Sequence, residues 1–213
     1  MIAAARLGWM CGWLLALGGV ATPIAAQDGP MPPKAVSHTE ARNKLWMLIH
    51  TECKPAAERN RYPPAPCAEV DATDHGVAAG YAVLKDRTGR YQYLVLPLAR
   101  IAGIESPALR APGAPNYFAA AWTARLYVEA ALHGTQPRDV LSLVVNSAPS
   151  RSQDQLHIHV DCIRADVHAA LQRLLPMITG QWRPLGGTLP PHQHVYQAMW
   201  TDGETLAINP FAS

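Results

Sequence analysis

The sequence contains little charge of either sign. Lysine, arginine, aspartate and glutamate make up 16% of its 213 residues, and the formal net charge is +2. Proteins that bind nucleic acid concentrate lysine and arginine on one surface, so this composition predicts no nucleic-acid partner. The sequence also lacks internal repeats, which excludes repeat arrays. It has no linker-like stretch that would demand a second folded domain.

A long hydrophobic run lies near the N-terminus. Arg6 gives a positive start, residues 7–21 are almost uninterrupted apolar sequence, and residues 23–26 offer small side chains for cleavage. This pattern is typical of an export signal, and the run also approaches the ~20 residues of a membrane-spanning helix. We predict that residues 1–26 are a cleaved signal or a retained anchor. The protein would then be periplasmic, or held in the inner membrane facing the periplasm, with residues 27–213 forming a single domain.

Cysteine is scarce. Cys53, Cys67 and Cys162 follow the N-terminal segment, and an odd number in an oxidising compartment predicts one disulfide and one spare thiol. The pair Cys53 and Cys67 is favoured because a proline-rich loop separates them, whereas Cys162 lies on the apolar face of a predicted strand. Three buried thiols are the alternative.

The most informative stretch is QLHIHVD, residues 155–161. Side chains alternate between the two faces of a strand, so this stretch divides into an apolar face and a chemical face. The apolar set is Leu156, Ile158, Val160 and Cys162, and the polar set is Gln155, His157, His159 and Asp161. Imidazole titrates near neutrality, so two adjacent histidines can act as nucleophile, proton donor or metal ligand.

Hydrophobic spacing predicts helices and strands in alternation along the remaining chain. A possible capping box of Ser37 and Glu40 opens the first helix, and prolines from Pro55 onward end it. In chain order the predicted elements are a helix over residues 38–53, an antiparallel hairpin of residues 80–86 and 90–98, a helix begun at Asn116 and closed by Gly134, a strand over residues 140–145, the histidine strand, and a helix stopped near Pro176. This order predicts an α+β fold, an antiparallel sheet with helices packed on it.

Several blocks of the sequence resemble the bacterial CDP-diacylglycerol pyrophosphatases, a branch of the histidine triad superfamily. The blocks are PAPCAEV (64–70), GYAVLKD (80–86), QYLVLPLARIAGIESPAL (92–109), PNYF (115–118) and LHIHVDCIRADV (156–167). The resemblance runs from about residue 43 to about residue 211. It implies a histidine-triad-like fold that hydrolyses CDP-diacylglycerol to CMP and phosphatidate at a membrane surface, with no cofactor and no metal.

The resemblance also implies roles for individual residues. His157 matches the central histidine, which attacks the nucleotide phosphorus to form a nucleotidyl-histidine that water then hydrolyses. His159 matches the last histidine, beside the transferred phosphate, where it helps charge to leave. The residues implied in substrate and phosphate binding are Gln155, Asn146, Arg151, Ser152 and Gln153.

Two features depart from the family pattern. The family motif begins with histidine, and an amide such as Gln155 can hold a carbonyl or an imidazole but cannot be charged. Relatives also continue beyond the segment that ends at Phe211 with further strand, so the domain is expected to be shortened at its C-terminus, with an open sheet edge. Because superfamily members often dimerise, the resemblance further implies a homodimer.

Two alternatives come from other functional classes. A zinc-dependent hydrolase could take ligands from His157, His159 and Asp161, with more from His192 and His194. A non-catalytic protein that binds CDP-lipid or nucleotide would fit the altered motif and the short C-terminus. Metal analysis separates the first alternative from histidine chemistry, and CMP release separates the second.

Overall fold

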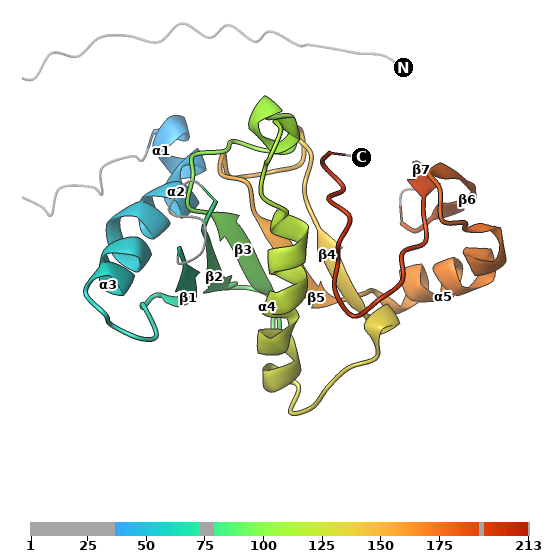
Figure 1. The fold of residues 1–213 in the computed structure, drawn as a ribbon, viewed down its shortest axis with the longest axis horizontal. Helices are drawn as coiled ribbons and strands as arrows, with labels where there is room; N and C mark the ends of the chain where they lie inside the picture. The colour runs from blue at the N-terminus through green and yellow to red at the C-terminus, as the bar shows by residue number, and fades with distance from the viewer. Residues whose placement is uncertain (1–36, 73–78, 192–193, 213) are drawn as a thin grey trace, which may run out of the picture. The chain divides into compact units, whose positions relative to one another are not determined.

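The computed structural model describes residues 37–72, 79–191 and 194–212 (Figure 1). The predicted signal or anchor, residues 1–26, and the candidate ligand His192 lie outside these ranges. The described residues form a five-stranded antiparallel sheet with helices packed on it, which confirms the predicted α+β class. None of them belongs to a helix long and apolar enough to cross a membrane.

The sheet has the order β1–β2–β3–β5–β4, and neighbouring strands are antiparallel. The predicted hairpin is confirmed as β2 and β3, with Lys85 opposite Tyr93 near its turn. Strand β1 is not expected from the sequence, because CAEVD carries two carboxylates and no clear apolar alternation. In chain order the strands are β1 (Cys67–Asp71), β2 (Tyr81–Lys85), β3 (Tyr93–Pro97), β4 (Leu141–Val144) and β5 (Ile158–Cys162).

Helix α4 (Tyr117–Ala131) covers one face of the sheet. It begins where predicted, because the side chain of Asn116 accepts a hydrogen bond from the backbone N–H of Ala119 at 3.1 Å. Gly134 helps to close the helix as predicted, because its N–H donates to the carbonyl of Glu129 at 3.0 Å, but the left-handed residue is His133, with φ of 60°. Histidine is among the residues that tolerate this conformation. The strand residues buried on this face are Val83, Val95, Leu141, Ile158 and Val160.

A helical segment packs on the other face over β1, β2 and β3 (Figure 1). Its parts are α1 (His38–Arg42), α2 (Lys44–Leu48), the π-helical turn η1 (Ile49–Cys53) and α3 (Lys54–Glu58). The predicted capping box is present, but the prediction that Pro55 ends the helix is wrong. Pro55 lies in the first turn of α3, where a missing N–H is tolerated. The helical segment leaves β4 and β5 partly uncovered on this face of the sheet, where Val144 is 49% exposed.

A disulfide joins the helical segment to the sheet. Cys53 of η1 is bonded to Cys67 of β1, as predicted, and both residues are buried. Cys162 is free and exposed, which corrects the expectation that it lies in the core. It is the last residue of β5, so the apolar face that buries Ile158 and Val160 ends before it.

The C-terminal part adds helix α5 (Ala165–Leu174), as predicted, and a separate two-stranded sheet that the sequence pattern does not indicate. The strands of that sheet are β6 (Arg183–Leu189) and β7 (His194–Ala198). Elsewhere in the described residues, short 3-10 helices are η2 (Pro107–Arg110), η3 (Arg138–Val140) and η4 (Leu175–Met177). The following segment returns to α4. Ring centroids of Phe211 and Phe118 lie 5.1 Å apart, and the indole N–H of Trp122 donates to the carbonyl of Glu204 at 2.8 Å.

Candidate active site

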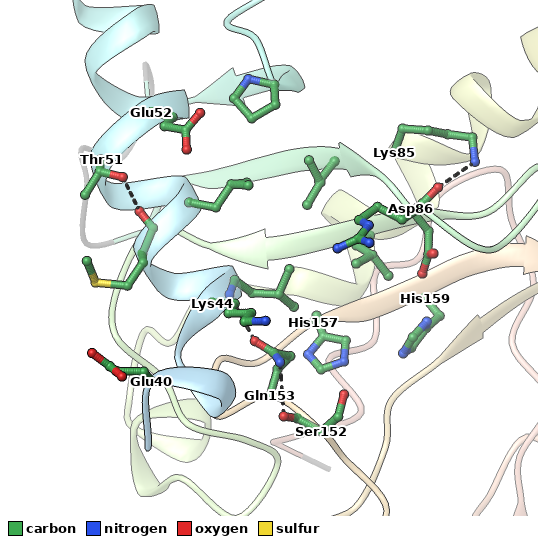
Figure 2. Close-up of a pocket in the computed structure, with 17 residues that line it drawn as sticks. Glu40, Lys44, Thr51, Glu52, Lys85, Asp86, Ser152, Gln153, His157 and His159 are labelled. Atoms are coloured by element: carbon green, nitrogen blue, oxygen red, sulfur yellow. Dashed lines mark hydrogen bonds between the residues drawn. The ribbon is translucent and has the colours of Figure 1, made fainter. Parts of the chain in front are cut away.

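A cleft of about 710 Å³ lies where the helical segment stops covering the sheet, and it contains both motif histidines. His157 precedes β5, and His159 lies on β5 between Leu94 of β3 and Val144 of β4. Figure 2 shows His157 and His159 side by side, with Gln153 and Lys44 on the helical side. The other polar residues of the cleft are Glu40, Thr51, Glu52, Lys85, Asp86, Arg87 and Ser152, and its apolar residues are Leu45, Met47, Leu48, Pro66, Leu84 and Leu94.

The hydrogen bond made by His157 fixes which of its nitrogens is free. Nδ1 lies 2.7 Å from the backbone carbonyl oxygen of Gln155. A carbonyl oxygen only accepts, so Nδ1 carries the proton and donates it. In the neutral ring Nε2 then keeps an available lone pair. His157 is also buried, 7% exposed, so packing restricts its ring. This arrangement presents a nucleophilic nitrogen.

His159 is held beside His157. The two ring centroids are 5.0 Å apart, and the side-chain amide nitrogen of Asn146 lies 3.3 Å from His159 Nε2. Burial lowers the pKa of His159, and the neighbouring His157 lowers it further, while Asp86 and Asp161 oppose the shift. The lowered pKa favours the uncharged imidazole of His159. The structure thus brings together three predicted site residues: His157, His159 and Asn146.

Gln155 does not project beside the histidines, which corrects the expected alternation. It is fully buried, and its Nε2 donates to the backbone carbonyls of Pro97 at 2.9 Å and Ala99 at 3.0 Å. Within the described part of the chain its Oε1 has no hydrogen-bond partner. Residue 155 precedes β5, so the strand period does not govern its direction. Its amide anchors the backbone whose carbonyl orients His157.

Arg151 faces carboxylates and is not among the residues that line the cleft. Its guanidinium donates to both carboxylate oxygens of Glu105, at 2.6 and 2.8 Å, and its Nε donates to Asp154 at 3.1 Å. Asp154 also accepts two hydrogen bonds of 2.6 Å from Arg42 of α1. These bonds, those from Arg42 first, lower the pKa of Asp154. The network therefore fixes the loop before β5 against α1.

Ser152 and Gln153 do line the cleft. Gln153 links its loop to the helical segment, because its Oε1 accepts from the N–H of Leu45 at 3.0 Å and its Nε2 donates to the carbonyl of Ala41 at 2.9 Å. Lys44 also lines the cleft and carries no motif signal, so only the folded chain reveals it. The fold places it there by docking α2 beside the histidine loop.

The described residues do not favour the zinc alternative. No group of three or more histidine, cysteine, aspartate and glutamate side chains within them is arranged to hold a metal ion. Asp161 turns back to its own strand, where its Oδ1 accepts from the N–H of Cys162 at 2.8 Å. His194 belongs to β7 of the separate sheet.

We expect Gln155→His to keep the fold and to hold or raise turnover, because histidine can donate to one of the two carbonyls that glutamine now serves. Gln155→Leu is the matched control. It removes the donor from the buried carbonyl of Pro97, at a cost of about 1–3 kcal/mol, and from the partly buried carbonyl of Ala99. Urea unfolding and CMP release measure both variants. Loss of turnover in a folded Gln155→His protein would contradict the assignment of residue 155 to the first motif position.

The fold and the site define a class of enzyme. A buried imidazole whose Nδ1 is hydrogen-bonded, a second imidazole whose pKa is lowered and nearby cations are groups compatible with hydrolysis of a phosphorus anhydride. The family model of CDP-diacylglycerol pyrophosphatase matches residues 40–213. The chain belongs to this family, whose members hydrolyse a lipid pyrophosphate.

Proposed function

We propose that the protein hydrolyses CDP-diacylglycerol through a nucleotidyl-histidine formed on His157. One observation carries the mechanism: the 2.7 Å hydrogen bond from His157 Nδ1 to the carbonyl of Gln155. A ring held in this tautomer directs an unprotonated Nε2 into the cleft without a separate base. The family match supports the substrate, because the family acts on CDP-diacylglycerol.

The reaction proceeds in two displacements. His157 Nε2 forms a bond to the phosphorus of the CMP moiety, the bond from this phosphorus to the bridging oxygen breaks, and the electron pair leaves with phosphatidate. Water then attacks the same phosphorus, the P–N bond breaks, and its electron pair returns to Nε2. One water proton remains on CMP and the other is released. CMP and phosphatidate are the products.

Positive charge near the phosphates would stabilise both transition states. Lys44, Lys85 and Arg87 line the cleft. A phosphate leaving group departs as an anion, so cations and hydrogen-bond donors assist it more than a strong acid would. Two of the three carboxylates of the cleft already accept backbone hydrogen bonds: Glu40 accepts from the N–H of Ser37 in the capping box of α1, and Asp86 accepts from that of Thr88 in a turn. These bonds reduce their repulsion of the substrate.

We also propose that the protein is exported and works at a membrane surface. The Cys53–Cys67 disulfide supports export, because disulfides persist in oxidising compartments. Exposed side chains around β6 and β7 support contact with lipid, since tryptophan and tyrosine favour the membrane–water interface. They are Met177, Trp182, Val195, Tyr196 and Trp200, of which Val195 is 80% exposed.

One experiment tests the function. Purified protein is mixed with vesicles that contain CDP-diacylglycerol, with and without a chelator, and CMP release and co-sedimentation with the vesicles are measured. We expect chelator-resistant release by protein that sediments with the vesicles. Chelator-sensitive release would support the zinc alternative. Binding of the lipid without any CMP release would support a non-catalytic binding protein.

A further inference from the structure

A second cleft, of about 440 Å³, opens on the far side of His159. His159 lines both clefts, whereas His157 lines only the first. Asn146, which contacts His159, also lines the second cleft. The two hollows therefore share one catalytic ring, and a substrate with two different halves could occupy both.

The direction of attack assigns one half to each cleft. In an in-line displacement the leaving oxygen lies opposite the attacking nitrogen. We place the leaving oxygen beside His159, because the resemblance implies that this ring helps charge to leave and its centroid lies only 5.0 Å from that of His157. The group carried by that oxygen continues past His159 toward the second cleft. The nucleotide, which stays bonded to His157, remains in the first.

We propose that the second cleft binds the phosphatidate half of the substrate. The assignment rests on the proposed function. The cleft offers three aliphatic side chains, Val144, Ile163 and Val167, and the guanidinium of Arg164. Val144 is 49% exposed, so a strand position open to water carries an apolar group that an acyl chain would cover.

The residues that line the second cleft include one cation, Arg164, which could contact a glycerophosphate. Arg164 forms an ion pair with Asp166 through hydrogen bonds of 2.7 and 3.1 Å from its Nη2 and Nε, so a phosphate at this position would share the guanidinium with that carboxylate. Asp161 also lines the cleft, but one of its oxygens is occupied by the N–H of Cys162. The volume suits the glycerol and the first methylenes, and the remaining acyl chain lies outside in lipid.

The test compares CDP-diacylglycerol with CDP-glycerol, a soluble compound that has the same pyrophosphate and no acyl chains. Val144→Asn is expected to lower the ratio of kcat/KM for the lipid to kcat/KM for CDP-glycerol by about tenfold, the effect of one apolar contact in a pocket. Met47→Asn is the matched control, because Met47 is 52% exposed and lines the first cleft. It should change both substrates in the same proportion.

A loss of lipid preference in Met47→Asn but not in Val144→Asn would overturn the assignment and place the lipid in the first cleft. Binding provides a readout that does not depend on turnover. Short-chain CDP-diacylglycerol is titrated into His157→Ala and into the double variant His157→Ala/Val144→Asn. About tenfold weaker binding to the double variant supports the subsite even if the proposed chemistry fails. Equal affinities would overturn the subsite even if the chemistry holds.

Discussion

His157→Ala is expected to abolish CMP release and to prevent formation of any covalent nucleotidyl-enzyme. Removing a nucleophile whose function no neighbour replaces should lower kcat by about 10⁴-fold or more. The neighbouring imidazole cannot substitute for it directly, because Asn146 contacts His159 Nε2. Substrate that carries a radioactive CMP moiety, followed by peptide mapping of acid-labile label, measures both effects. Circular dichroism checks that the variant folds.

His159→Ala is the matched comparison, because the two rings are neighbours on the same segment. It should slow the reaction while His157 still accepts the label. The same comparison tests whether His157 or His159 corresponds to the central histidine of the family motif. Label that persists in His157→Ala and disappears in His159→Ala would show that the nucleophile lies two residues further along the chain.

Removal of the disulfide is expected to have the largest effect on stability. The Cys53→Ala/Cys67→Ala variant should lose about 3 kcal/mol in free energy of unfolding, because the bond closes a loop with a sequence separation of 14. The bond also joins η1 to β1 next to Glu52 and Pro66, which line the cleft. Urea unfolding monitored by tryptophan fluorescence measures the change.

Cys162→Ser is the control for that experiment. Cys162 is free and exposed, so its replacement should change the free energy of unfolding by less than about 0.5 kcal/mol. Mass mapping of the oxidised protein should find a peptide pair joined through Cys53 and Cys67. A crosslink through Cys162 would contradict both the pairing and the expected stability loss.

Local patterns predicted much of the fold. The β2–β3 hairpin follows from alternating apolar residues, and the starts of α1 and α4 follow from the caps at Ser37 and Asn116. Strand β1 and the continuation of the helix through Pro55 depend on tertiary contacts, which short-range patterns do not encode. Burial of CAEVD against its neighbours outweighs its weak strand pattern.

In the candidate site, too, local sequence predicts some features and tertiary contacts determine the others. The histidine pair is visible in the sequence because both rings lie on one short segment. The directions of Gln155 and Arg151 are not, because carbonyls and carboxylates brought from other parts of the chain determine them. Lys44 enters the cleft only through docking of α2. Residues whose placement depends on long-range contacts cannot be assigned from spacing alone.

The strand order determines when the sheet can be completed during synthesis of the chain, because the histidine strand β5 pairs with strands on both sides. β4 is synthesised before β5, yet β5 lies between β3 and β4 in the sheet. In a nascent chain that does not yet include β5, β4 therefore lacks its single strand neighbour in this sheet. Completion of the sheet and alignment of His159 with Asn146 are one event. Fragments that end before residue 158 should be poor starting points for dissecting the enzyme, because they lack the pairing of β5 with β3 and β4 as well as His159.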